Sequence, residues 1–539
     1  MRLSELYAPT LREAPRDLDP PGQQALARAG LFRLLDAVPG AGAALLPAGQ
    51  IAVDRLAATL ITAISAPVPQ PIALPQPPGE ATTADLVIAL LARDLRSYRE
   101  LPLLLSARTT AITAAPRARL GLLAAREEPA LELWLAAARD GLEPALERIT
   151  DALRRALRGL GAATDRVAAP APSGHLGERW VARDLTDALA IAWCPACDVR
   201  SVASLAPVTP VPRPATDPGP WRAVATPDQR TVEEVAAYLG QTPADLLKTL
   251  IVEADGALVA ALIPGDRDLS LDKLGALLGA RTLRLAPDAA VVAATGAPVG
   301  FAGPVGLALP IVADRAAAPR TAWTTGGNAR DVHHLDVSPG RDFVAMHMAD
   351  IVAFEDRDPC PVCSAARSAR AGLGLARIDR FGTAPADRVA LTVDGASGGA
   401  EPVGLVRVRV RLARLLGAIA EAATTDRGLV WPARAAPWDV AVVGLGAAGD
   451  AVSAAAGTLA MALEARGLAI LRDDRDLRPG QKLGDAETMG HPLIAVVGRR
   501  GLERGVFELR RRGRGDVVEI ALDDAVERVL AERAQEVGA

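Results

Sequence analysis

Apolar and polar positions along this chain follow two different periods. Leu, Ala, Arg and Glu recur at helical spacing over residues 84–98 and 120–160, which predicts helices there. After residue 220 the pattern changes, and Thr231 with Glu233 or Glu234 close behind predicts a capped helix start. Short runs of Val, Ile and Leu predict strands at 250–252, 258–263 and 311–313. We therefore expect a compact α+β domain that ends near residue 345.

The C-terminal part alternates between strand and helix. Strands are predicted at 440–443, 468–471 and 493–497, and helices at 449–466 and 482–489. This order is typical of a small α/β domain with a mostly parallel sheet. Two other segments carry weaker patterns: residues 350–430 are predicted to be irregular, and the proline-rich residues 205–220 to be a linker.

Composition and charge narrow the class of protein. The 539 residues allow three or four domains at about 150 residues each. Hydrophobic residues make up 50% and charged residues 23%, which excludes a disordered chain. The net charge of -4 excludes a surface that is positive throughout and leaves a local nucleic-acid site open. The N-terminus lacks the apolar run of a signal peptide, and the longest uncharged stretch contains several prolines. We expect a cytoplasmic protein that does not bind membranes.

Lysine is rare in this chain. Of 60 Lys and Arg residues only Lys248, Lys273 and Lys482 are lysines, in a background rich in Ala, Arg, Gly and Pro that indicates a GC-rich genome. Lys273 is predicted to lie on an exposed helix, and Lys482 to open a C-terminal helix. Neither is assigned a role, whereas Lys248 returns below as a candidate site residue.

The four cysteines form two Cys-x-x-Cys pairs on either side of the α+β domain. They are Cys194, Cys197, Cys360 and Cys363. If the domain is inserted into a host, its entering and leaving strands must be neighbours, so both pairs meet at the neck. Four thiolates are the tetrahedral set that structural zinc prefers, with no position left for catalysis. The alternatives are four reduced thiols or two separate redox pairs.

Several short motifs occur in an order that resembles one family. They are Met1-Arg-Leu-Ser, Arg28-Ala-Gly-Leu-Phe-Arg, Ser97-Tyr-Arg-Glu-Leu-Pro-Leu, Asp426-Arg-Gly-Leu-Val-Trp-Pro and Met489-Gly-His-Pro. Together they resemble bacterial prolyl-tRNA synthetase over nearly the whole chain. The resemblance implies a multidomain α/β and α+β chain. A class II synthetase-like antiparallel-sheet core is interrupted by an α+β editing insert and followed by an α/β anticodon-binding domain. The implied boundaries are 1–204 and 348–430 for the core, 222–347 for the insert and 431–539 for the anticodon-binding domain.

The core departs from the family pattern where the family binds ATP and proline. The family's phosphate-binding arginine and glutamate align with Ile112-Thr-Ala-Ala115, and its glycines beside the nucleotide align with the arginine-rich run 407–413. Arg414 retains the motif arginine and is assigned to substrate binding. The proline-pocket stretches at 82–85 and 373–384 also lack family residues. Each lost transition-state contact costs about 10²–10³ in rate, so we expect proline activation to be lost.

The insert retains the family's editing motifs. The resemblance assigns catalytic roles to Lys248, Gly300, Gly303, Pro304 and His333, and substrate binding to Asp266 and Asn328. An ammonium makes a compact contact to a phosphate, and glycines let a loop backbone approach an ester. In the family, water attacks the ester with help from backbone groups and the tRNA's ribose hydroxyl. Taken alone, Lys248 fits an ordinary salt bridge, the glycine loop a turn, and His333 a solvated residue.

The C-terminal domain carries a basic run that is predicted to lie on a hairpin. Arg510, Arg511 and Arg512 are assigned to tRNA phosphates, with a solvated turn as the alternative. A tRNA(Pro)-like molecule is the expected partner, DNA is not, and the family implies a possible homodimer.

Three functions stay open on the sequence. The first is a prolyl-tRNA synthetase homologue with an eroded ATP and proline site that hydrolyses mischarged aminoacyl-tRNA of the Ala-tRNA(Pro) type. The second is a divergent but active proline–tRNA ligase, which alone would need ATP and Mg²⁺. The third is a non-catalytic tRNA-binding or regulatory protein.

Overall fold

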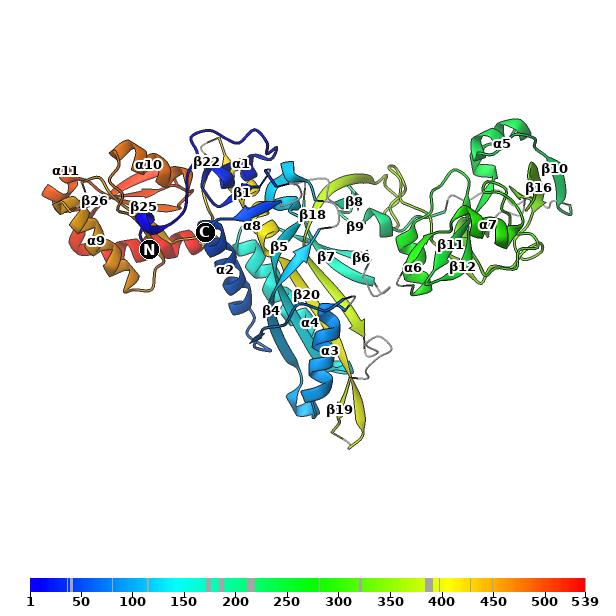
Figure 1. Ribbon diagram of the computed structural model, residues 1–539, viewed down its shortest axis with the longest axis horizontal. Coiled ribbons are helices and arrows are strands. Elements are labelled where there is room, and N and C mark those ends of the chain that lie inside the picture. The colour runs from blue at the N-terminus through cyan, green and yellow to red at the C-terminus, as the bar shows by residue number, and fades with distance from the viewer. Residues whose placement is uncertain are drawn as a thin grey trace. The chain divides into compact units, whose positions relative to one another are not determined.

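The computed structural model divides into two compact units (Figure 1). Unit 1 comprises Met1–Asp165, Trp180–Leu185 and Leu373–Ala539, and unit 2 comprises Arg166–Arg179 and Thr186–Gly372. The structure describes all residues except 36, 39–41, 80, 114–115, 171–175, 184–188, 211–218, 281, 319–321, 383–390, 397, 427, 448 and 539. The predicted linker and the two core motifs at 112–115 and 373–384 therefore lie partly outside the described residues.

A largely antiparallel sheet forms the centre of unit 1. Its strands run in the order β3, β4, β5, β20, β18, with the short β19 paired to β20. Their bounds are Gln70–Ile72, Leu103–Ile112, Glu127–Ala138, Ala400–Arg411 and Ser368–Gly382, with β19 at Thr392–Asp394. Trp134 on β5 lies opposite Leu105 on β4 and Arg407 on β20. This register places the odd-numbered arginines of β20 on the same face as Glu132 and Trp134.

Helices cover both faces of this sheet. Helices α2 (Pro47–Thr62), α4 (Arg139–Gly159) and α8 (Leu412–Ala423) share one apolar core with the even-numbered valines of β20. Helix α3 (Thr83–Asp94), which starts at a capping box of Thr82 and Asp85, packs on the other face against Trp134 (Figure 1). A layered core of this kind is the antiparallel class of architecture that the resemblance implied.

Two sequence-based predictions about unit 1 are wrong. Residues 120–160 are not one helical region, because β5 takes Glu127–Ala138 before α4 begins. β5 is buried on both faces, so apolar and polar residues do not alternate along it, and its many Leu and Ala residues resemble a helix. Residues 350–430 are not irregular, because β18, β20 and α8 lie there. Alternation of Arg and Val along β20 carried the strand signal.

The C-terminal part of unit 1 has the predicted α/β arrangement. Its sheet order is β24, β23, β25, β26, β27, in which the first three strands are parallel and the last two antiparallel. The strand bounds are Ile470–Asp473, Val440–Gly444, Leu493–Val497, Val506–Arg511 and Asp516–Ala521. Helices α9, α10, α11 and α12 span Ala451–Glu464, Pro479–Thr488, Arg499–Glu503 and Ala525–Gly538. α9 and α12 pack on one face of the sheet and α10 on the other.

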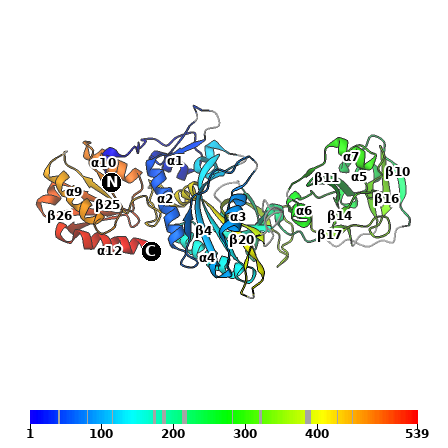
Figure 2. The same ribbon diagram turned by 60° about the horizontal axis from the view of Figure 1, so that its bottom comes forward.

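Unit 2 holds the predicted α+β domain. One sheet has the order β13, β11, β12, β14, β17, and a second has the order β10, β16, β15. The first sheet's strands are Leu283–Leu285, Leu247–Ala254, Ala257–Pro264, Ile311–Asp314 and His347–Ala349; the second sheet's are Arg222–Ala225, Val332–Val337 and Trp323–Gly326. Helices α5 (Val232–Leu239), α6 (Leu271–Leu278) and α7 (Asp288–Thr295) surround these strands (Figure 2).

The remaining elements are short or join larger ones. They are α1 (Pro21–Arg28), β1 (Phe32–Leu34), β2 (Ala43–Leu45), β6 (Asp165–Pro170), β7 (Leu176–Arg183), β8 (Leu189–Trp193), β9 (Arg200–Val202), β21 (Thr424–Thr425) and β22 (Gly428–Leu429). Within unit 2, β8 pairs with β9 and with the first residues of β18. This pairing brings the two chain segments that carry the cysteines side by side.

Candidate functional site

The loop at residues 300–304 lies directly against the backbone of β15. A Cβ on Gly303 would lie 1.7 Å from the carbonyl oxygen of Gly326, and one on Gly326 would lie 2.3 Å from that of Ala302. Gly300 has a φ of 101°, in the region that favours glycine. Glycine is thus required on both sides of the contact, since any side chain would push the two backbones apart. The predicted residues Gly300, Gly303 and Pro304 belong to one fixed loop.

Asn328 fastens this loop. Its Oδ1 accepts from the Gly303 N–H at 2.8 Å, and its Nδ2 donates to the carbonyl oxygens of Gly303 and Val305 at 3.0 Å each. Three hydrogen bonds of one amide side chain are thus made to the loop backbone. The structure therefore places Asn328 as a residue that positions the loop.

His333 lies next to the same loop. It pairs across the strands with Gly326, and its ring centroid is 5.9 Å from that of Phe301. Its Nδ1 is 2.7 Å from the hydroxyl of Thr226, and the residue is only 3% exposed. Burial, and then the neighbouring His334, lowers the pKa of His333 to about 4. His333 is neutral at pH 7 and can present its second ring nitrogen as a hydrogen-bonding group.

Lys248 stands apart from His333 within this unit. It lies on β11 opposite Ile263, and its Nζ is 3.5 Å from Oδ1 of Asp268. Among the described residues, no hydrogen bond or ion pair joins Lys248 to His333. The lysine side chain is 23% exposed and the partner carboxylate 88%, so the pair is weak and its ammonium is available to a ligand. Asp266 is exposed on the adjoining loop.

The prediction that Lys273 lies on an exposed helix is wrong. It is not on an exposed face, because it is only 8% exposed and its Nζ donates to Asp350 at 2.8 Å and to the Val352 carbonyl at 2.7 Å. Burial lowers the pKa of Lys273, while Asp350 raises it. Lys482 is likewise buried, and its Nζ donates to the carbonyl oxygen of Gly444 at 2.9 Å. Both lysines satisfy buried backbone and carboxylate groups and serve the fold.

The four cysteines meet in unit 2, as the insertion argument predicted. Their sulfur atoms lie within 4.8 Å of one another, with Cys194 and Cys363 at 3.5 Å and Cys197 and Cys360 at 3.6 Å. The two turns have the same form, because Asp198 and Ser364 both have a φ of 60° and donate to the carbonyl of the first cysteine at 2.9 Å. The cluster can hold a metal ion. Tetrahedral zinc with bonds of about 2.3 Å separates its sulfurs by about 3.8 Å, close to these distances.

The sheet face of unit 1 that carries Arg407 is filled by buried charge pairs. The Arg407 guanidinium donates to Oδ2 of Asp379 at 2.6 Å and 3.1 Å, and lies 3.7 Å from Glu132. Asp379 and Glu132 are fully buried, and Arg407 is 6% exposed. Arg409 donates to the same glutamate at 2.6 Å. The ring centroid of Trp134 is 5.3 Å from the Arg407 guanidinium and closes the cluster.

The arginine at position 414 belongs to a second buried group on this sheet. Its backbone N–H donates to Glu128 at 2.9 Å, and its Nε lies 3.5 Å from the same carboxylate. Arg411 lies 2.6 Å from Glu128. Burial raises the pKa of Glu128, and the two arginines oppose that shift. Glu128, Glu132 and Asp379 were missed in the sequence because residues 120–160 and 350–430 were not interpreted as strands.

The C-terminal arginines lie on the predicted hairpin, and carboxylates hold two of them. Arg511 pairs with Asp516 and, at 3.1 Å, with Glu532. Arg510 lies 3.1 Å from Glu487, and Arg512 donates to the carbonyl oxygen of Leu429 at 3.2 Å. These contacts hold the arginines of the hairpin within unit 1.

Comparisons with known proteins match this architecture. Residues 226–342 match the model of the aminoacyl-tRNA editing domain, and residues 439–532 that of the anticodon binding domain. The chain is 34% identical to a proline–tRNA ligase of Solidesulfovibrio magneticus, over 99% of this chain and 98% of the relative. It is 32% identical to one of Moorella thermoacetica, over 99% of each.

The chain belongs to the proline–tRNA ligase family. A solved structure of prolyl-tRNA synthetase from Cryptosporidium parvum has the same fold, with a TM-score of 0.51 at 10% identity over 96% of this chain and 77% of that one. No helix within the described residues is both long enough and apolar enough to cross a membrane.

Proposed function

We propose that this protein binds a tRNA(Pro)-like tRNA and hydrolyses a mischarged aminoacyl ester of the Ala-tRNA(Pro) type in its insert. The contact of Gly303 with the Gly326 backbone, held by Asn328 beside a neutral His333, is the main support. Such a site offers fixed backbone groups and a buried hydrogen-bonding ring to an ester, with no reorganisation during reaction.

Each residue has a role in this proposal. Water attacks the ester carbonyl carbon, the bond to the ribose oxygen breaks, and that oxygen takes the proton, which leaves free amino acid and tRNA. Gly300, Gly303 and Pro304 shape the loop that faces the ester. His333 borders the amino-acid pocket. Lys248 contacts a phosphate of the tRNA terminus, with Asp266 on the adjoining loop as a further tRNA contact, and Asn328 positions the loop.

We infer that the core of unit 1 does not activate proline. A nucleotide needs an uncommitted arginine at its phosphates, whereas Arg407 is committed to Asp379 and Arg414 to Glu128. Turning either arginine towards a ligand would take one of its paired arginines away from a buried carboxylate, which costs stability. The alternative of an active ligase is supported by the similarity to proline–tRNA ligases over 99% of the chain.

A deacylation assay with a panel of mischarged tRNAs tests the main proposal. We expect release of alanine from Ala-tRNA(Pro) well above the rate without protein, and slow release of proline from Pro-tRNA(Pro). If alanine stays attached and Lys248→Ala changes nothing, the third candidate, a non-catalytic binding protein, replaces this proposal. The assay needs neither ATP nor free proline, so it is independent of the state of the core.

We also propose that the cysteine cluster binds structural zinc. The paired turns and sulfur distances support four thiolate ligands and no open position. Metal analysis of the purified protein should give one zinc per chain, and Cys360→Ser should lose it together with thermal stability of unit 2. A chain that is metal-free and equally stable would contradict this assignment.

A further inference from the structure

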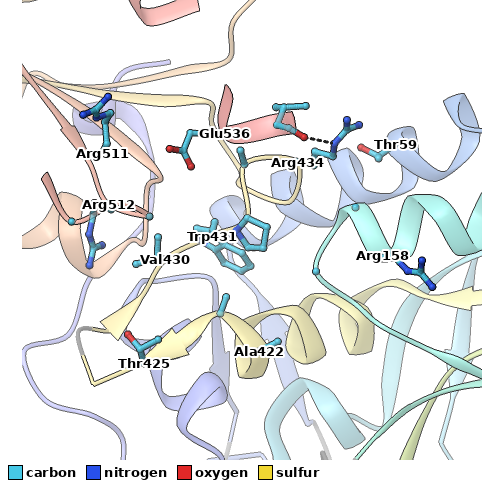
Figure 3. A pocket seen from close by; sticks show the side chains of 18 of the residues that line it. Thr59, Arg158, Ala422, Thr425, Val430, Trp431, Arg434, Arg511, Arg512 and Glu536 are labelled. Atoms are coloured by element: carbon cyan, nitrogen blue, oxygen red, sulfur yellow. Dashed lines mark hydrogen bonds between the residues drawn. The ribbon is translucent and has the colours of Figure 1, made fainter. Parts of the chain in front are cut away.

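A groove of about 1460 Å³ lies in unit 1 and has no role in the functions above. Its walls come from the end of α4, the segment after α8, the residues around Trp431, the β26 hairpin and the end of α12 (Figure 3). This volume exceeds the roughly 300–1,000 Å³ of small-molecule sites. Small residues make up much of the wall, so an extended ligand can approach closely; they are Ala63, Ala152, Ala156, Gly159, Gly161, Ala422, Ala423, Gly513 and Gly515.

The lining carries positive charge on a chain that is negative overall. Six arginines and four carboxylates line the groove, a surplus of two positive charges, against a net charge of -4 for the chain. The arginines are Arg155, Arg158, Arg434, Arg510, Arg511 and Arg512; the acids are Asp426, Glu487, Asp516 and Glu536. The hairpin arginines already have partners within unit 1, as described above.

The other wall has arginines that form no ion pair with a described carboxylate. Arg155 and Arg158 lie three residues apart on one face of α4, are exposed, and make no side-chain hydrogen bond or ion pair with any described residue. Arg434 lies beside them, because its Cδ is 3.5 Å from where a Cβ on Gly159 would be, and its Nε donates to the Val537 carbonyl at 3.3 Å. Among the described residues, no carboxylate forms an ion pair with these three guanidinium groups, which favours an anionic ligand.

The aromatic ring in the groove is not available for stacking on a nucleic-acid base. Trp431, at its centre in Figure 3, is 1% exposed, and its Nε1 donates to the Met489 carbonyl at 3.0 Å. Its ring is therefore packed and is not a stacking platform for an unpaired base. The polar character of the groove comes mainly from guanidinium groups, which suit the charges of a sugar–phosphate backbone.

We propose that this groove binds the sugar–phosphate backbone of tRNA through Arg155, Arg158 and Arg434, without regard to base sequence. The inference rests on tRNA binding by the family and does not require the insert to be an active deacylase. It assigns an RNA contact to α4, outside the matched anticodon-binding domain and outside the residues that the sequence had suggested for phosphate contact.

The test measures tRNA binding by the full chain at several salt concentrations. Arg155→Ala/Arg158→Ala should weaken binding about tenfold near 0.1 M salt. The double variant should also reduce the slope of the logarithm of the association constant against the logarithm of salt concentration by about 1.5. This is the sum for two phosphate contacts, since each contributes about 0.7–0.9. Lys replacements at both positions should keep most of the slope, because counterion release depends on charge. The matched control is Arg154→Ala on the same helix, whose side chain pairs with Asp151 and does not line the groove.

Each outcome of this binding test either supports or overturns the proposed RNA contact. An equal loss for tRNA(Pro) and an unrelated tRNA supports backbone binding, whereas unchanged affinity and slope overturn it. If the double Ala variant instead changes the oligomeric state, as measured by light scattering, the groove is a protein interface and the proposal is wrong. Deacylation by the wild-type chain is measured separately. If the wild-type chain does not deacylate but the double Ala variant still shows the reduced salt slope, only the proposed deacylase function is contradicted and the RNA-binding groove stands.

Discussion

Buried polar and charged groups have different partners in the insert and in the core sheet. In the insert, glycines and one amide fix a backbone loop beside His333, while the ion-pair partner of Lys248 is the exposed Asp268. In the core, arginines and carboxylates satisfy one another inside the protein, at Arg407 with Asp379 and at Arg411 and Arg414 with Glu128. A buried cluster whose charges are already balanced gains little from binding a charged ligand. A loop with a fixed backbone and an available cation beside it can bind such a ligand favourably.

The largest expected effect comes from breaking the core network. Arg407→Ala removes one of the two arginines that pair with the buried Asp379, the other being Arg377, so we expect a loss of up to about 3–5 kcal/mol in the free energy of unfolding of unit 1. Urea unfolding followed by tryptophan fluorescence measures it. The exposed pair of Arg466 and Glu527 is the control, and Arg466→Ala should cost less than about 1 kcal/mol. Equal costs for the two variants would show that the core charges are not a closed network.

A second variant tests the shape of the insert site. Gly303→Ala places a methyl group 1.7 Å from the Gly326 carbonyl oxygen, so the loop must move. We expect deacylation to fall by about 10²–10³, the cost of losing a positioned electrostatic group. Gly219→Ala, which meets nothing within 4 Å, is the matched control in the same unit. Wild-type deacylation by the Gly303 variant would remove this loop from the site.

Lys248→Ala separates binding from stability. The exposed ion pair with Asp268 contributes less than about 1 kcal/mol, so the melting temperature should hardly move. Loss of a phosphate contact should lower deacylation about tenfold at low tRNA concentration, and less at saturation. Lys248→Arg should restore part of this loss. A variant that melts earlier but deacylates normally would make Lys248 a structural residue.

The smallest effect concerns pH. Because burial lowers the pKa of His333 from 6.5 to about 4, its protonation state does not change between pH 6 and 8, and deacylation should show no titration by this residue there. The unfolded chain takes up the proton near pH 6.5, so His333 stabilises the fold fully above that pH, and the stabilisation is lost as pH falls towards 4. His333→Gln should therefore flatten the stability profile below pH 6.5. A rate profile with an inflection near 6.5 that disappears in this variant would contradict the buried, neutral ring.

The sequence predicted the insert better than the core for a physical reason. Short strands and capped helices such as α5, which starts at Thr231, carry local signals of alternation and capping. β5 has apolar residues on both faces and many helix formers, so only its partners β4 and β20 make it a strand. The pairing of Asp379 with Arg407 follows from that register and is not visible in either segment alone.

The cysteine cluster was predicted from the topology of the insertion and not from the spacing of the cysteines in the sequence. No short motif joins Cys194 to Cys360, yet the requirement that an inserted domain enters and leaves through neighbouring strands predicted their meeting. By contrast, the position of Lys273 depends on Asp350, which is distant in sequence, and the exposed helix predicted for it was wrong. The predicted homodimer and the cytoplasmic location stay predictions.

Proline-dependent exchange of pyrophosphate into ATP by the full chain tests the central contrast most directly. A core whose arginines are committed to Asp379 and Glu128 should give no exchange above background, under conditions in which the same preparation deacylates Ala-tRNA(Pro). Exchange that requires proline and saturates with it would contradict the account and establish this chain as an active ligase.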